Sequence, residues 1–203
     1  MQVFKVYPAG FAANSYIVTG DNKTCAVIDC AQPRVLSRCK ELNLKPVCAL
    51  LTHGHYDHVG GCAAFAAEGV PVMCGKDEKE LIFSQGYMSL CGNSVPRFEI
   101  SKTFSDGDEF EAAGVKFKVI ATPGHTAGGV TYLAENCLFT GDTLFCRSVG
   151  RTDLPTGDAR SLIQSVKKLY ALKGDYTVYC GHEDDTSLEA ERRGNYYIQD
   201  DNA

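Results

Sequence analysis

The sequence predicts an α/β protein that folds as one compact domain over residues 1–203. Three observations support this fold class. The 203 residues suffice for one substantial hydrophobic core but are few for two full domains. Hydrophobic residues make up 44% of the chain and charged residues 22%, as in ordinary globular proteins. Predicted strands followed by predicted helices occur in each half of the chain, which indicates two similar halves packed together.

Patterns in the first half predict five strands and two helices. One helix is expected where Pro33 stands early and Val35, Leu36 and Cys39 follow at helical spacing. A second helix is expected in a stretch rich in small residues, which would pack closely on a sheet. The expected strands are Gln2 to Tyr7, Asn14 to Thr19, Thr24 to Asp29, Val47 to Leu51 and Val70 to Cys74. The expected helices are Pro33 to Leu42 and Gly60 to Glu68.

The stretch from Lys76 to Arg97 admits two interpretations. It begins with KDEKELIF, which can be helical, and continues with SQGYMSLCGNSVP, a mixture typical of a loop or a lid. A surface connection and a segment that covers substrate fit this composition equally well.

The second half is predicted to contain five strands and an amphipathic helix. Asp158 is expected to cap that helix and Gly174 to end it. Thr186 and Glu189 form a capping-box pattern for a terminal helix. The expected strands are Glu109 to Ala112, Val115 to Ala121, Val130 to Ala134, Cys137 to Thr140 and Tyr176 to Cys180, and the amphipathic helix is Asp158 to Leu172.

Charge and cysteine usage narrow the class of function. A net charge of −5 argues against a broad basic surface for nucleic acid or an anionic membrane. The N-terminal sequence MQVFKVYPAGFAANSY has neither a signal-peptide pattern nor a membrane-spanning stretch. We therefore expect a cytoplasmic protein that acts on a small-molecule substrate. The ten cysteines include no CxxC pair, so we expect buried, reduced thiols rather than disulfides or an iron–sulfur site.

The densest cluster of ligand-type side chains is THGHYDHVGG, from Thr52 to Gly61. It follows the apolar run of an expected buried strand, and loops at strand ends commonly carry function. His53 and His55 are two residues apart, which in an extended segment directs both imidazoles to one side. Asp57 and His58 follow where the chain turns toward a helix. Nitrogen and oxygen ligands at this density suit zinc or a similar divalent metal, and a solvated polar turn is the alternative.

The remaining histidines, His125 and His182, each follow a glycine at the end of a predicted strand. Asp142 occupies another strand-end loop. A single histidine in such a position is usually a surface or packing residue. Because all five histidines occur at strand ends, the joint interpretation is a metal site assembled from four loops at one edge of the sheets. These loops are far apart in sequence, so the fold must bring them together.

The order HxHxDH at His53 to His58, then His125, Asp142 and His182, resembles the ligand set of the metallo-β-lactamase superfamily. The resemblance covers nearly the whole chain. The motifs PGHTAGG at Pro123 to Gly129, GDTLF at Gly141 to Phe145 and GRTD at Gly150 to Asp153 resemble the glyoxalase II branch in its short stand-alone form. The resemblance implies a four-layer αββα sandwich with the site at one edge of the paired sheets. It also implies a chain without the C-terminal helical domain that supplies glutathione-binding surface in full-length glyoxalase II.

The same resemblance implies a dinuclear metal site. It assigns His53, His55 and His125 to a first metal, Asp57, His58 and His182 to a second, and Asp142 to a bridge between both. The implied cofactors are two divalent metal ions, zinc first, with iron or manganese as alternatives. Such a site lowers the pKa of bound water and so makes hydroxide available to attack a small thioester, by resemblance a hydroxyacyl thioester. We assign Asp57 the further catalytic role of orienting that hydroxide.

Four other residues lie near the motifs. Three of them have two interpretations each, and the fourth is interpreted as structural. Arg151 and Asp153 are either residues at the edge of the substrate or, as we favour, an ion pair that braces their loop. Tyr56 either faces substrate or packs against the following helix. Cys146 lies close in sequence to Asp142, and we interpret it as structural because the aspartate already fills the bridging position.

The sequence departs from the glyoxalase II pattern at the last ligand. Members of this branch often have GHGP followed by threonines, whereas this chain has GHEDDTS. The carboxylates of Glu183, Asp184 and Asp185 could raise the pKa of bound water or disfavour an anionic substrate. Alternatively, they belong to a solvated loop that caps the terminal helix.

Three competing functions remain. The nearest rival is the persulfide dioxygenase branch, which shares the GRTD stretch but holds one iron through two histidines and an aspartate. Hydrolysis of a lactone or a phosphodiester would use the same hydroxide, since the mechanism does not itself choose the ester. A non-catalytic metal-binding role is the least favoured, because all seven ligand positions are intact.

Overall fold

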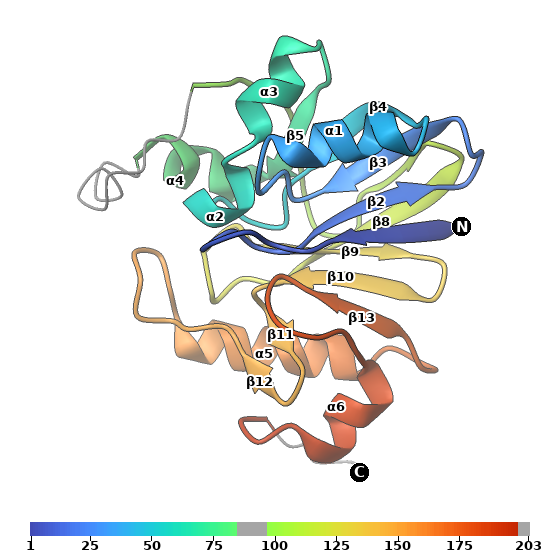
Figure 1. Ribbon diagram of the computed structural model, residues 1–203. Coiled ribbons are helices and arrows are strands. Elements are labelled where there is room, and N and C mark those ends of the chain that lie inside the picture. The colour runs from blue at the N-terminus through green and yellow to red at the C-terminus, as the bar shows by residue number, and fades with distance from the viewer. Residues whose placement is uncertain (85–96, 199–203) are drawn as a thin grey trace.

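The computed structural model describes residues 1–84 and 97–198. In this part of the chain two six-stranded sheets lie face to face, and helices cover the outer side of each sheet (Figure 1). The four layers are those of the αββα sandwich predicted from the sequence, and the two similar halves correspond to the two sheets with their helices.

The first sheet contains the N-terminal strands in sequence order. Strands β1 to β3 are antiparallel, and β3 to β6 are parallel. Figure 1 shows α1 and α3 on the outer side of this sheet. The strands are β1 (Gln2–Val6), β2 (Ser15–Thr19), β3 (Thr24–Ile28), β4 (Lys45–Leu50), β5 (Val72–Gly75) and β6 (Ile100–Phe104). The helical segments are α1 (Arg34–Glu41), α2 (Tyr56–Val59), α3 (Cys62–Ala67), the 3₁₀ turn η1 (Lys76–Glu78) and α4 (Lys79–Ser84).

The second sheet has the order β14-β13-β10-β9-β8-β7. Strands β7 to β10 are antiparallel neighbours, and β13 joins β10 in parallel. A two-stranded ribbon, β11 with β12, follows β10. The strands are β7 (Glu109–Ala112), β8 (Val115–Ala121), β9 (Val130–Ala134), β10 (Cys137–Gly141), β11 (Leu144–Phe145), β12 (Ser148–Val149), β13 (Thr177–Cys180) and β14 (Thr186–Ser187). The covering helices are α5 (Ala159–Tyr170) and α6 (Leu188–Gly194).

Three apolar layers hold the four structural layers together. Side chains alternate along a strand, so Ile17 packs toward the helices while its neighbours Tyr16 and Val18 pack between the sheets. The layer between the sheets is rich in aromatic side chains, including the fully buried Phe117 and Tyr132. Strands such as β2 are therefore buried on both faces, as expected for sheets covered on both sides.

Most predicted elements are confirmed within one or two residues, and the differences have physical reasons. The helix expected from Gly60 to Glu68 is wrong in its extent, because the chain forms α2, a break and then the shorter α3. At the break, a Cβ on Gly61 would meet the Gln32 carbonyl carbon at 2.5 Å. Strand β6 was not predicted, since it is a largely exposed edge strand with a central lysine, a composition typical of sheet edges.

The helix caps give one confirmation and two corrections. The Asp158 side chain accepts a hydrogen bond from the Ser161 amide and so caps α5 as predicted. The capping box at Thr186 is wrong, because Thr186 still pairs in β14 and Ser187 caps α6 instead. Helix α5 ends at Tyr170, before the turn that contains Gly174.

Two further expectations can be compared with the described residues. KDEKELIF is helical as predicted, in η1 and α4. The choice between a loop and a lid falls on residues 85–96, which lie outside the described residues. The nine described cysteines are free thiols, and all except Cys146 are buried. Among the described helices, none has the length and apolar character needed to cross a bilayer.

Replacement of Tyr132 with phenylalanine tests how the second sheet supports the loop that follows β4. The Tyr132 hydroxyl donates a hydrogen bond to the Leu51 carbonyl across the buried layer, at 2.9 Å. We expect Tyr132→Phe to lower the free energy of unfolding by about 1 kcal/mol, measured by urea denaturation. In the control Tyr176→Phe, which removes an exposed hydroxyl, we expect a change below about 0.5 kcal/mol. Equal effects of the two variants would contradict this expectation.

Candidate metal centre

The predicted ligands lie together in four loops at one edge of the two sheets. His53 and His55 follow β4, His55 with extended backbone, and Asp57 and His58 lie in α2. The other three ligands lie in separate loops that follow β8, β10 and β13 and hold His125, Asp142 and His182, respectively. The fold thus brings all seven side chains together as the sequence predicts.

His53, His55 and His125 form the first group. Each offers a ring nitrogen, and the three nitrogens lie within 4.8 Å of one another. The three imidazoles are almost completely buried. The Nε2 atoms of His53 and His55 have no hydrogen-bond partner among the described residues. Because a buried polar atom without a partner is costly, these nitrogens fit a cation better than an empty interior.

Asp57, His58 and His182 form the second group, and their ligand atoms also lie within 4.8 Å of one another. Asp57 Oδ2 lies 3.1 Å from His182 Nε2 and 3.8 Å from His58 Nε2. His58 is fully buried, and its Nε2 atom has no hydrogen-bond partner in the described part of the chain.

Asp142 lies between the two groups. Its Oδ1 atom is 3.2 Å from His58 Nε2, and its Oδ2 atom is 3.4 Å from both His125 Nε2 and His182 Nε2. Asp142 Oδ1 is itself buried without a hydrogen-bond partner among the described residues. One carboxylate therefore contacts ligands of both groups, as a bridging residue would. The donor set of imidazole nitrogens and carboxylate oxygens fits a pair of divalent metal ions.

The two groups differ in the protonation of their histidines. Burial, with the nearby imidazoles of His58 and His125, holds the pKa of His53 well below its usual range. Burial and the neighbouring His125 lower the pKa of His55 to about 4. His53 and His55 are thus neutral at physiological pH, the form in which imidazole binds metal.

In the second group, carboxylates favour the protonated imidazoles. Burial opposes this effect at His182, but hydrogen bonds to Asp142 and Asp57 raise the pKa of His182 to about 9. Burial also opposes it at His58, where the charges of Asp142 and Asp29 nevertheless hold the pKa well above its usual range. A metal that binds to this group must therefore displace protons.

A buried carboxylate that the sequence interpretation missed supports the second group. Asp29, at the end of β3, accepts hydrogen bonds from the Thr52 amide and hydroxyl, each at 2.8 Å. Its Oδ2 atom also lies 2.8 Å from His58 Nδ1, which fixes the ring so that Nε2 faces the site. The available signal was positional, because Asp29 ends an apolar strand at the same edge as the other ligands.

Arg151 braces the first group through its backbone. Its carbonyl oxygen lies 2.7 Å from His125 Nδ1, which orients the imidazole. Its guanidinium binds Asp153 through two contacts of 2.6 Å, so the predicted ion pair is confirmed. Both side chains remain largely exposed, and Arg151 also lines the cavity beside the site.

A cavity of about 480 Å³ opens beside the two groups. Its wall combines ligand side chains with apolar residues and one cation. Tyr56 belongs to this wall, so the structure places it where the interpretation that it faces substrate requires it. Cys146 belongs neither to the wall nor to a ligand group. The lining residues are His55, Tyr56, Asp57, His125, Asp142, Phe145, Arg151, Leu154 and His182.

The acidic segment after His182 is anchored to the first sheet. Asp185 forms an ion pair with Lys5 at 2.9 Å and accepts a hydrogen bond from the Tyr16 hydroxyl at 3.0 Å. The Glu183 carbonyl accepts hydrogen bonds from Lys5 Nζ and Asn14 Nδ2, each at 3.1 Å. A helix-capping role for Asp185 is wrong, because its carboxylate holds the loop of His182 against β1 and β2.

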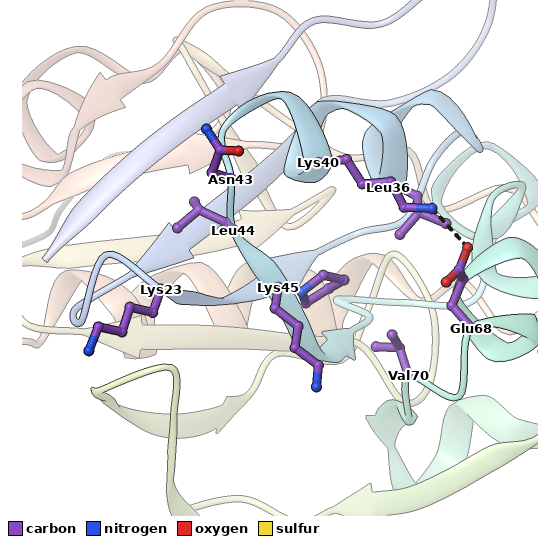
Figure 2. A pocket seen from close by; sticks show the side chains of 9 residues that line it. Lys23, Leu36, Lys40, Asn43, Leu44, Lys45, Glu68 and Val70 are labelled. Atoms are coloured by element: carbon purple, nitrogen blue, oxygen red, sulfur yellow. Dashed lines mark hydrogen bonds and ion pairs between the residues drawn. The ribbon is translucent and has the colours of Figure 1, made fainter.

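A second hollow, of about 410 Å³, lies where β4 begins, whereas the metal ligands follow the end of that strand. Figure 2 shows Lys40 paired with Glu68, while the amines of Lys23 and Lys45 extend in different directions. No cluster of metal-ligating side chains is found there among the described residues. The clusters of metal-ligating side chains in the described residues therefore lie at the other end of the strand.

Comparison with known proteins identifies the class to which this fold and site belong. Residues 8–182 match the family described as the Metallo-beta-lactamase superfamily. The chain belongs to this superfamily of metal-binding hydrolases, as the resemblance of its motifs predicts.

Two relatives carry the name of one enzyme of this superfamily. The chain is 31% identical over 198 residues to hydroxyacylglutathione hydrolase GloC of Haemophilus influenzae, and this match covers 93% of this chain and 93% of the relative. It is 44% identical over 135 residues to a hydroxyacylglutathione hydrolase of Brucella anthropi, and this match covers 65% of the chain and 45% of the relative. The chain thus matches less than half of the second relative.

Two solved structures share nearly the whole fold. BLEG-1, a B3 metallo-beta-lactamase, has a TM-score of 0.90 and 28% identity, and the match covers 98% of this chain and 100% of that one. TTHA1623, solved in a di-iron-bound form, has a TM-score of 0.85 and 31% identity, with coverage of 97% and 100%. The His and Asp clusters are typical of a dinuclear site in this superfamily.

The pH dependence of metal binding should separate the two groups. Binding to the second group must release the protons of both His58 and His182, so we expect its affinity to rise by up to about 100-fold per pH unit between about pH 6.5 and 9. His53 and His55 release no proton in this range, so affinity of the first group should rise less steeply. Stepwise zinc affinities, measured by chelator competition across this range, check the expectation. Parallel slopes for the two steps would contradict it.

Proposed function

We propose that this protein is a dinuclear metal-dependent hydrolase that cleaves a small thioester, by preference a hydroxyacyl thioester. The observation that carries the proposal is the convergence of seven ligand-type side chains on two groups joined by Asp142. In this proposal the first metal is held by His53, His55 and His125, the second by Asp57, His58 and His182, and both by Asp142.

The names of the relatives support the choice of a thioester. Hydroxyacylglutathione hydrolases are the named relatives at 31% and 44% identity. The first of these matches over nearly its full length, so the similarity includes the whole site and its cavity.

The cavity beside the ligands is compatible with such a substrate. Its volume of about 480 Å³ lies in the range of small-molecule sites. Phe145 and Leu154 offer apolar contacts to an acyl chain. The Phe145 ring also lies edge-on to the imidazole of His182, at 6.0 Å between centroids, so the apolar wall adjoins the ligands directly.

The metals and the side chains around them have different roles in the proposed reaction. When bound, the two metals would supply hydroxide at neutral pH and polarise the substrate carbonyl. Asp57 contacts His182 and borders the cavity, so its carboxylate is placed to accept a hydrogen bond from the attacking hydroxide and orient it toward the substrate.

Metal content and a substrate panel test the proposed reaction together. We expect two metal ions per chain and oxygen-independent hydrolysis of a hydroxyacyl thioester at a higher kcat/KM than a lactone, a phosphodiester or a β-lactam. Elemental analysis and initial rates measure these quantities on the same preparation. One iron per chain with oxygen consumption on a persulfide would favour a dioxygenase, and preferred turnover of another ester would overturn the thioester assignment.

Asp57→Asn tests the proposed catalytic role of Asp57. Loss of the carboxylate should lower kcat by about 100-fold or more, because a neutral amide orients the hydroxide less well than a carboxylate, while the three-histidine group still binds metal. Single-turnover rates and metal content measure the two effects. As a control of equal charge change, Asp184→Asn alters an exposed residue near His182 and should leave kcat within about twofold. An Asp57→Asn variant with both metals and full turnover would contradict the assignment.

A further inference from the structure

A second buried carboxylate, Glu78, lies between the two loops of the first metal group. It ends η1, directly after β5, and its side chain has no exposed surface. A fully buried glutamate is uncommon unless it is bonded on all sides. The bonds of Glu78 therefore indicate what it supports.

Both carboxylate oxygens of Glu78 are bonded, one to each loop. Oε2 accepts a hydrogen bond from the Gly54 amide at 2.7 Å, and Gly54 lies between His53 and His55. Oε1 accepts bonds from the Gly128 amide at 2.9 Å and from the Thr126 hydroxyl, directly after His125. One side chain thus joins the segments that present the three histidines.

The glycines on either side allow this close approach. A Cβ on Gly54 would lie 2.8 Å from Glu78 Oε2 and 2.6 Å from the Ile82 side chain. A Cβ on Gly128 would lie 2.4 Å from the Glu78 backbone nitrogen. Only glycine fits at both positions, so each loop is shaped to receive the glutamate.

We propose that Glu78 is a positioning residue for the first metal site, because its carboxylate fixes the loop of His53 and His55 against the loop of His125. The proposal rests on the proposed function, in which these three histidines hold one metal. All three groups that face the carboxylate donate hydrogen bonds, so only an acceptor at both oxygens satisfies them. The effect is preorganisation, since the imidazoles lie together before the metal arrives.

Glu78→Gln is the variant that tests this role. Glutamine keeps the size of the side chain but places an NH₂ donor against one of the donors, so one loop loses its bond. We expect affinity for one of the two metals to fall by about 10- to 100-fold, and the affected step should be the one that His125→Ala abolishes. In the metal-free protein, the Gly54 or Gly128 amide should exchange with solvent faster. Chelator competition and hydrogen exchange measure the two effects without any assay of activity.

Glu191→Gln is the matched control. Glu191 is also buried, and its oxygens accept bonds from the Arg147 amide, the Thr186 hydroxyl and the Asn195 side chain, none of which carries a predicted metal ligand. Its replacement should lower stability to a similar extent and leave both metal affinities within about twofold. If Glu78→Gln does not fold, Thr126→Val removes one of the bonds to Oε1 and should weaken the same metal step by about threefold or more.

The outcomes distinguish this proposal from the proposed function. Unchanged metal affinities in Glu78→Gln or Thr126→Val, against wild-type protein that binds two metals, would overturn the positioning role alone. Equal losses of affinity in Glu78→Gln and Glu191→Gln would also overturn it, because the effect would then follow from stability. Wild-type protein that binds no metal would overturn the proposed function and with it the positioning role.

Discussion

The main constraint on this structure is a set of buried ligand atoms, most of them imidazole nitrogens, that have no hydrogen-bond partner in the described part of the chain. Three Nε2 atoms and one carboxylate oxygen, on His53, His55, His58 and Asp142, are buried without hydrogen-bond partners among the described residues. Each such group costs about 1–3 kcal/mol of stability when left unpaired. Folding therefore builds a site that is complete only with cations, and the four loops that supply it must be held in place by the rest of the molecule.

Two buried carboxylates hold the loop that follows β4. Asp29 bonds Thr52 and His58 from β3, and Glu78 bonds Gly54 from η1. They act on different groups, since Asp29 orients a ligand of the second group while Glu78 joins the loops of the first. Because an unpaired buried carboxylate would be costly, each also favours the loop arrangement in which its hydrogen bonds are complete.

The sequence predicted the metal ligands better than the residues that hold the ligand loops in place. His125 and His182 were recognised because every histidine follows a strand, and position in the chain is visible in the sequence. Glu78 carries no such signal, since a single glutamate in a short charged helix usually faces solvent, and only the approach of two distant loops buries it. For the same reason the capping box at Thr186 was wrong, because local pattern does not reveal that β14 pairs this residue with Val178.

The wall of the cavity is fixed by different elements from those that hold the loop that follows β4. Phe145 lies in the ribbon of β11 and β12, and the adjacent Arg147 amide donates to the buried Glu191 of α6. Asn195, at the end of α6, bonds the Ser148 carbonyl in the same ribbon. Helix α6 thus anchors one side of the cavity, while β3 and η1 anchor the loop after β4. Changes in the ribbon can therefore alter the substrate without disturbing the metal chemistry, which gives a physical reason for the variety of substrates on one fold.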